Sequence, residues 1–162
     1  MKNIELKMNR KELGFLVAEG EGYNVEFKES YSDSIAKDIC AFANSNGGKI
    51  LLGITDDKRI KGITITNVLK SQIQDISRNF DPRFEVFIEN IGNILIINVP
   101  EGTNKPYSTN GKFYLRQGTN SQQLSRDEIR EFFQKEGLIL FDEKRNSEFD
   151  RKKDISKKAY KN

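Results

Sequence analysis

The residues with the greatest potential for chemistry lie between positions 21 and 57 of this 162-residue chain. Val25 and Phe27 alternate with Glu26 and Lys28, a period of two that is typical of a half-buried strand and places the carboxylate and the ammonium on one face. A carboxylate can accept a proton or bind a hard divalent cation, and a lysine can contact phosphate or neutralise a neighbouring acid. The pair therefore indicates either a polar site or a structural ion pair.

The composition of the chain restricts the chemistry of any active site. There is no histidine, and Cys40 is the single cysteine. Histidine-dependent triads, Cys–His pairs and zinc sites built from histidines or several cysteines are therefore excluded. An enzyme of this composition would depend on carboxylates, lysines, tyrosines or a bound hard cation. Cys40 falls in an apolar helical pattern, which favours a buried side chain over a nucleophile.

A short helix is predicted beside these polar residues, because apolar residues recur at i, i+4, i+7 and i+8: Ile35, Ile39, Phe42 and Ala43. Gly47 and Gly48 are expected to end this helix, and the apolar run 50–54 is expected to form a buried strand. Asp56 then lies at a strand end. Asn44 and the glycine pair either contact a phosphate or serve the fold. ATP binding is not supported, because no Walker lysine follows a glycine loop.

The remaining patterns predict the scaffold. They are a helix between the capping box Asn9–Glu12 and Gly20 or Gly22, a strand over 60–65, a helix capped by Asn67 and ended by Pro82, strands over 84–89 and 94–99 joined at Gly92–Asn93, a hairpin over 106–116 turning at Asn110–Gly111, and a helix between the capping box Ser125–Glu128 and Gly137. Helices and strands intermingle with hairpins. The expected fold class is therefore α+β, with a mixed β-sheet partly covered by helices.

The charge distribution suggests one domain followed by a basic tail. The net charge is +3, of which residues 144–162 contribute +5 (eight basic and three acidic residues) and residues 1–143 contribute −2. We interpret 1–143 as one domain and 144–162 as a solvated tail or linker. A nucleic-acid surface would therefore be a local patch or the tail. No segment is apolar enough for a membrane span or a signal peptide, which favours a cytoplasmic location.

Four elements of the sequence resemble the Schlafen AlbA-like family: Glu-x4-Glu-Phe-Lys at 21–28, Ala-Phe-Ala-Asn-x-x-Gly-Gly at 41–48, Gly-Ile-x-Asp at 53–56 and Tyr-Leu-Arg-Gln-Gly-Thr-Asn-Ser at 114–121. This family is described as a DNA-binding domain of bacterial transcriptional regulators and ATPase-like proteins. The resemblance implies a nucleic-acid-binding domain with DNA or RNA as its partner. A non-catalytic assembly module is a further alternative.

The resemblance also implies an enzymatic alternative. In Schlafen members that cleave RNA, two glutamates at this spacing and an aspartate after the glycine-bearing strand form a metal site, and these positions correspond to Glu21, Glu26 and Asp56. The three carboxylates would bind Mg²⁺ or Mn²⁺ and make the chain an endoribonuclease acting on structured RNA. The structural alternative pairs Glu26 with Lys28, leaves Asp56 as a turn residue and leaves Glu21 solvated.

The predicted nucleic-acid contacts are Lys28, Asn44, Arg116 and Thr119. Arg116 precedes a hydroxyl-rich loop that suits phosphate oxygens, and its alternative is a strand-end arginine that covers apolar surface. A homodimer is also expected, because eukaryotic relatives resemble two copies of this domain joined around a basic groove. The strands around Asn110–Gly111 are the candidate contact between the two copies.

Overall fold

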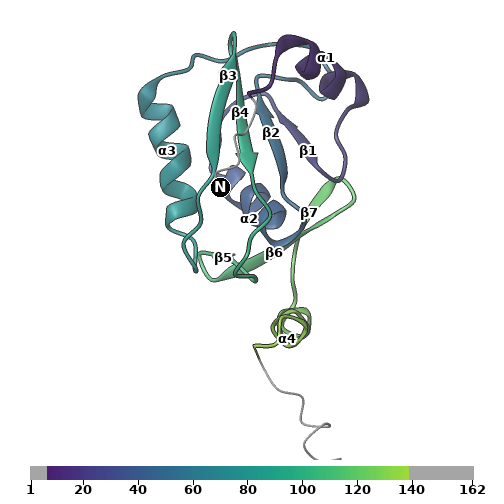
Figure 1. The fold of residues 1–162 in the computed structure, drawn as a ribbon, viewed down its shortest axis with the longest axis vertical. Helices are drawn as coiled ribbons and strands as arrows, with labels where there is room; N and C mark the ends of the chain where they lie inside the picture. Colours follow the sequence, from purple (N-terminus) through teal and green to yellow (C-terminus); the bar gives the residue numbers. More distant parts are fainter. Residues whose placement is uncertain (1–6, 139–162) are drawn as a thin grey trace, which may run out of the picture. The chain divides into compact units, whose positions relative to one another are not determined.

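The structure is a computed structural model that describes residues 7–138. Figure 1 shows the order of its elements: α1 (Arg10–Glu19), β1 (Val25–Lys28), α2 (Ile35–Asn44), β2 (Gly48–Leu52), α3 (Asn67–Arg78), β3 (Phe87–Ile91), β4 (Ile94–Val99), β5 (Ser108–Thr109), β6 (Lys112–Gln117), β7 (Asn120–Gln123) and α4 (Arg126–Lys135). Residues 7–124 form one compact unit, and α4 belongs to a second unit that begins at Ser125. The predicted tail, 144–162, lies outside the described residues.

The main sheet has four strands in the order β1-β2-β4-β3. β1 and β2 are parallel, whereas β2–β4 and β4–β3 are antiparallel. The parallel pair requires a crossover, which α2 supplies. The structure thus confirms the predicted α+β class with a mixed sheet.

The two faces of this sheet bury different helices. Ile50 and Leu52 pack with the apolar faces of α2 and α3, whereas Leu51 between them packs with Leu13 of α1. The alternation of strand side chains divides the apolar residues of β2 and β4 between these two clusters. Among the helices that the structure describes, none is long and apolar enough to cross a bilayer.

A smaller sheet is formed by β5, β6 and β7 in that order. Its first hairpin turns at Asn110 and Gly111, which have φ angles of 51° and 75°. Two adjacent positive φ values are the signature of a type I′ turn, and the sequence Asn-Gly favours it. The structure confirms this predicted hairpin and adds β7, which the sequence patterns did not predict.

The helix caps agree closely with the sequence. Both predicted capping boxes, Asn9–Glu12 and Ser125–Glu128, are present with reciprocal hydrogen bonds. The start of α3 is shifted by one residue, because Thr66 and not Asn67 accepts a hydrogen bond from the backbone N–H of Leu69. Either residue type can cap a helix, so only the local backbone decides which one does.

The predicted strand over 60–65 is wrong. Ile60 forms only an isolated bridge with Ile54, and its side chain is exposed. The backbone N–H groups of Lys61 and Gly62 both donate to the carbonyl of Gly53, so the segment wraps over the end of β2 instead of extending beside it. Gly62, at a φ of 78°, permits this turn.

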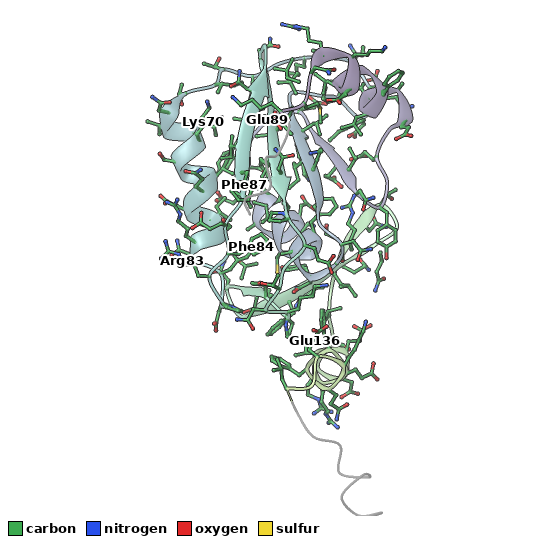
Figure 2. The ribbon with its side chains drawn as sticks, viewed as in Figure 1. Lys70, Arg83, Phe84, Phe87, Glu89 and Glu136 are labelled. Carbon is green, nitrogen blue, oxygen red and sulfur yellow. The ribbon has the colours of Figure 1, made fainter. Side chains whose placement is uncertain are left out.

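The predicted strand over 84–89 begins later than expected, at Phe87. Phe84 is buried, but its backbone N–H donates to the carbonyl of Ser77 at the end of α3. Figure 2 shows Phe84 before the strand and Phe87 and Glu89 on β3 itself. The alternating pattern of residues 84–86 therefore reflects which side chains are buried. It does not indicate strand pairing there.

Candidate functional site

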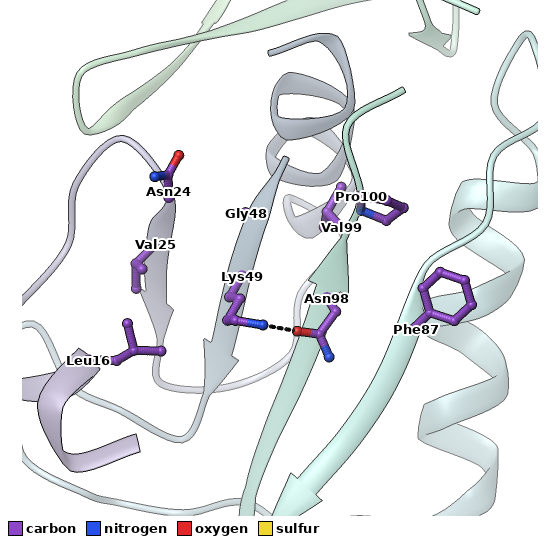
Figure 3. Close-up of a pocket in the computed structure, with 9 residues that line it drawn as sticks. All are labelled: Leu16, Asn24, Val25, Gly48, Lys49, Phe87, Asn98, Val99 and Pro100. Atoms are coloured by element: carbon purple, nitrogen blue, oxygen red, sulfur yellow. Dashed lines mark hydrogen bonds between the residues drawn. The ribbon is translucent and has the colours of Figure 1, made fainter. Parts of the chain in front are cut away.

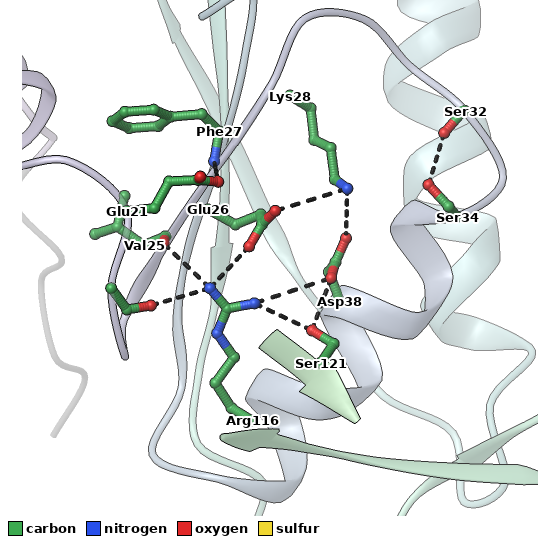
Figure 4. Close-up of polar contacts among 11 residues, drawn as sticks. Glu21, Val25, Glu26, Phe27, Lys28, Ser32, Ser34, Asp38, Arg116 and Ser121 are labelled. Carbon is green, nitrogen blue, oxygen red and sulfur yellow. Dashed lines mark hydrogen bonds and ion pairs between the residues drawn. The ribbon is translucent and has the colours of Figure 1, made fainter. Parts of the chain in front are cut away.

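A buried arginine joins the small sheet to the edge of the main sheet. Arg116 of β6 is 1% exposed, and its guanidinium reaches the edge of β1, as Figure 4 shows. Its Nη2 donates to the carbonyls of Gly22 and Val25 at 2.9 and 3.3 Å. The same nitrogen lies 2.8 Å from Oε1 of Glu26. Arg116 therefore occupies the edge of β1 where a further strand would pair.

A second carboxylate faces this arginine from the first turn of α2. Oδ1 of Asp38 lies 4.0 Å from Nη1 of Arg116, and the Ser121 hydroxyl donates to Oδ1 at 2.7 Å. Ser121 also accepts a hydrogen bond from Nη1 of Arg116 at 3.1 Å. Ser121 belongs to β7, so the second hairpin is connected to α2 through these contacts.

Lys28 completes a ring of alternating charges. Its Nζ lies 3.1 Å from Oδ2 of Asp38 and 3.7 Å from Oε2 of Glu26. The side chain of Lys28 is 24% exposed, that of Glu26 is 14% exposed, and those of Asp38 and Arg116 are buried. Solvent therefore reaches the ring mainly at Lys28. We call these four residues the charge ring.

The elements that surround the ring explain why it forms. The alternation of β1 points Glu26 and Lys28 to the face that α2 covers. Phe42 of α2 contacts the arginine through a cation–π interaction, since the Arg116 guanidinium lies over the Phe42 ring, 4.5 Å from its centre. The backbone N–H of Arg116 donates to the hydroxyl of Ser45 at 3.0 Å, just after the end of α2.

The ring changes the proton affinities of its exposed members. Burial raises the pKa of Glu26 to about 7, the hydrogen bond from Arg116 opposes this rise, and the charge of Asp38 adds to it. Burial alone would lower the pKa of Lys28, but the charge and hydrogen bond of Asp38 and the charges of Glu26 and Glu21 together raise it. Near neutral pH, Glu26 can therefore exchange a proton beside a lysine that stays charged.

Residues 21–125 match a family model described as Schlafen, AlbA_2. The chain belongs to the Schlafen AlbA_2 family. The match begins at Glu21 and includes the whole charge ring, and the family is broadly related to nucleic acids.

The fold of this Schlafen domain also occurs in a crystal structure of the DIP2311 protein from Corynebacterium diphtheriae. The two chains are 21% identical with a TM-score of 0.52, and the match covers 69% of this chain and 24% of that chain. The Schlafen chain thus spans about a quarter of the length of the protein it matches. The likeness concerns the fold.

The three carboxylates predicted as a metal site are not gathered together in the Schlafen domain. Glu21 accepts a hydrogen bond from the backbone N–H of Phe27 at 2.9 Å, and its charge contributes to the raised pKa of Glu26. Asp56 is exposed in the turn after β2, whereas Glu26 is in register with Ile50 in the middle of that strand. The structure thus brings Glu21 and Glu26 together and leaves Asp56 apart.

The charge ring does not fit a divalent cation as it is arranged. Glu26 and Asp38 are both paired with the cations Arg116 and Lys28, which compete with a metal for the same oxygens. Within residues 7–138, no group of three or more acidic or thiol side chains is arranged to hold a metal ion. Binding of Mg²⁺ or Mn²⁺ stays a prediction.

Asp38 is the member of the charge ring that the sequence patterns did not predict as a site residue. It follows Ile35 by three residues and precedes Phe42 by four, so it lies within the apolar stripe of α2. An acid in an apolar stripe must be paired or neutralised when it is buried. That position was a signal for a buried ion pair, although it could not identify Arg116 as the partner.

The predicted nucleic-acid contacts differ in their accessibility. Asn44 is buried, where its Oδ1 accepts from the backbone N–H of Tyr107 at 2.6 Å and its Nδ2 donates to the carbonyls of Tyr107 and Tyr114 at 2.9 and 2.8 Å. These bonds fasten the small sheet to α2, which favours the structural alternative. The burial of Arg116 gives no support to a direct phosphate contact. Thr119 is exposed in the β6–β7 turn, and its contact stays a prediction.

A hollow of about 340 Å³ lies between α1 and the segment that follows β2. Its lining includes the apolar side chains of Leu13, Val17 and Ile60 and two cations, Arg10 and Lys58. Nζ of Lys58 donates to a carbonyl at the end of α1 at 2.9 Å. In the part of the chain that the structure describes, neither cation is in an ion pair with a carboxylate. We call this feature the Arg10–Lys58 hollow.

Proposed function

We propose that this domain binds nucleic acid through phosphate contacts at the Arg10–Lys58 hollow. The observation that carries the proposal is the presence of two cations without carboxylate partners, among the described residues, on one concave surface. Lysine and arginine side chains that neutralise phosphates supply most of the affinity of non-specific nucleic-acid binding. Membership of a family broadly related to nucleic acids supports the same function.

Several other cations of the compact unit are less suited to this role, because nearby acids cancel their charge. Lys61 pairs with Glu29 at 3.2 Å, and Lys105 pairs with Glu101 at 2.8 Å. The charge ring likewise contains two acids and two bases. Arg10 and Lys58 differ from these paired cations, because both line one hollow and neither has a carboxylate partner among the described residues. In a transcriptional regulator or an ATPase-like protein, such a domain would supply the contact with DNA or RNA.

The test is a salt titration of binding. The affinity of the full chain for labelled duplex DNA, duplex RNA and single strands is measured by fluorescence anisotropy at several salt concentrations. Arg10→Ala and Lys58→Ala should each reduce the slope of log K against log salt by about 0.9 on duplex DNA, the value for one phosphate contact. Lys112→Ala, which removes an exposed lysine from the small sheet, should leave the slope unchanged. Equal slopes for all four proteins would refute the assignment of the hollow.

A second candidate function, cleavage of structured RNA, is favoured by Glu26. A general base is most effective when its pKa lies near the working pH, and the pKa of Glu26 is raised to about 7 beside the cationic Lys28. Glu26 would accept the proton of the attacking hydroxyl, and Lys28 would neutralise the phosphate. Lys28 is the most exposed member of the charge ring, so RNA would approach the ring on the side of Lys28.

Incubation of transfer RNA with the purified chain and Mn²⁺ tests this candidate. Loss of cleavage in Glu26→Gln with retention in Asp56→Asn would assign the base to Glu26, whereas loss in both and with chelator would support the three-carboxylate metal site. Circular dichroism of each variant controls for folding. If the wild-type chain leaves the RNA intact, the nuclease candidate fails. If it binds no nucleic acid either, the alternative of a non-catalytic assembly module is favoured.

A further inference from the structure

A groove of about 280 Å³ crosses the face of the main sheet that carries α1, at the end that α1 leaves open. Figure 3 shows the groove, which is lined by side chains from one helix and four strands: Leu16 of α1, Val25 of β1, Lys49 of β2, Asn98 of β4 and Phe87 of β3, with Pro100 beyond them. We call it the Lys49–Phe87 groove. It is separate from the charge ring, which lies on the opposite face.

Four of these residues form one row across the sheet. Val25 is in register with Lys49, Lys49 with Asn98, and Asn98 with Phe87. Residues in register on neighbouring strands point to the same face. Lys49 and Phe87 are two strands apart, a separation of about 10 Å at the usual strand spacing. This separation is on the scale of a nucleotide.

The polar side chains of the row are held in place by one another. Nζ of Lys49 donates to Oδ1 of Asn98, and Nδ2 of Asn98 donates to Oε2 of Glu89 at 2.8 Å. Glu89 is itself fixed by the backbone N–H of Met8 at 3.0 Å. An ammonium has three N–H donors, so the bond to Asn98 leaves donors for a ligand. Within residues 7–138, Lys49 has no carboxylate in ion-pair contact.

An aromatic ring lies in the same row as this cation, two strands away. Phe87 is 52% exposed on β3, which is an edge strand of the main sheet. Its neighbour in the row is the polar Asn98, so the hydrophobic core does not account for its position. An exposed aromatic ring and a cation at the spacing of a nucleotide are a combination by which proteins bind single-stranded nucleic acids, since bases stack on the ring and phosphates meet the cation.

We propose that the Lys49–Phe87 groove binds a single-stranded segment of nucleic acid, with a base stacked on Phe87 and a phosphate at Lys49. This inference rests on the proposed function and names its substrate class. The bases of a duplex are stacked on each other, so their faces are not available to Phe87. The charge of Lys49 favours an anionic occupant over an uncharged peptide.

Binding of a labelled oligothymidylate, an oligouridylate and a blunt-ended duplex to the full chain tests the groove. Phe87→Ala should weaken binding of the single strands about 5- to 150-fold, the range for the loss of one stacked base, and leave the duplex unaffected. Phe87→Tyr should preserve binding, and Phe87→Leu should behave like the alanine variant. Phe15→Ala, which removes an exposed phenylalanine outside the groove, is the matched control.

Lys49→Ala should reduce the salt slope of single-strand binding by about 0.7, the value for one phosphate on a single strand. If the wild-type chain binds single strands but the Phe87 and Lys49 variants bind equally well, the groove inference is overturned and the proposed function survives. If the wild-type chain binds no nucleic acid, both fail. Unequal affinities for the two single strands would show whether the groove prefers DNA or RNA. Urea unfolding of Phe87→Ala, expected to match wild type, separates lost contacts from lost stability.

Discussion

Replacement of Arg116 by methionine should destabilise the compact unit more than any surface substitution. The guanidinium is buried, bonds two carbonyls at the edge of β1, and pairs with Glu26 and Asp38. Methionine keeps much of the apolar volume over Phe42 but leaves two carboxylates without their arginine. The cost therefore arises from uncompensated charge and not from a cavity.

The expected loss is about 3–5 kcal/mol, the usual cost of removing one partner of a buried ion pair. Glu26 can relieve part of this cost by binding a proton, because its pKa is already raised to about 7. Asp38 keeps Lys28 at 3.1 Å. We therefore expect the lower half of that range at pH 6 and the upper half at pH 8.

Urea unfolding of the full chain, followed by circular dichroism, measures the effect. With a slope of about 2 kcal/mol per molar urea, the midpoint should fall by about 2 M. Arg83→Met removes an exposed arginine whose ion pair with Glu85 spans 4.0 Å, and it should change stability by less than about 0.5 kcal/mol. The double variant Arg116→Met/Glu26→Gln should recover part of the loss. A loss below about 1 kcal/mol, or no recovery in the double variant, would refute the reasoning.

Three further predictions concern pH, packing and assembly. The folded state raises the pKa of Glu26 from 4.5 to about 7, so the folded chain binds this proton more tightly than the unfolded chain does. The free energy of unfolding should therefore fall as the pH rises from 4.5 through about 7. Glu26→Gln should weaken this pH dependence, which urea unfolding at several pH values measures. Gly48→Ala should cost about 1–3 kcal/mol, since a Cβ there would lie 2.6 Å from the Phe42 ring, whereas Gly14→Ala, with nothing within 4 Å, should not destabilise α1; thermal unfolding compares them. Light scattering at micromolar concentration should show a homodimer at twice 18.6 kDa; a single-chain mass with and without nucleic acid would contradict it.

Features that depend on residues close together in the chain were predictable from the sequence. The capping boxes Asn9–Glu12 and Ser125–Glu128 and the turn Asn110–Gly111 formed as expected, because each requires only a few consecutive residues. The same applies to the shared face of Glu26 and Lys28, which follows from the period of a strand. The family itself was recognisable from such local patterns.

The role of each polar residue depended on the tertiary structure. Arg116 lies 90 residues after Glu26 and 78 after Asp38, and their pairing follows from β6 and β7 lying beside α2 and the edge of β1. Asn44 likewise bonds Tyr107, just before β5, and Tyr114 of β6, and no local pattern indicates these partners.

The Lys49–Phe87 groove has the same origin. Lys49, Asn98 and Phe87 come from three strands, and β4 lies between the other two in space although it follows both in the chain. Local sequence sets the direction in which each side chain leaves its strand, since that depends on backbone alternation alone. The neighbours it meets depend on which strands pair and which helix covers the face, because burial of apolar surface over the whole domain selects that arrangement.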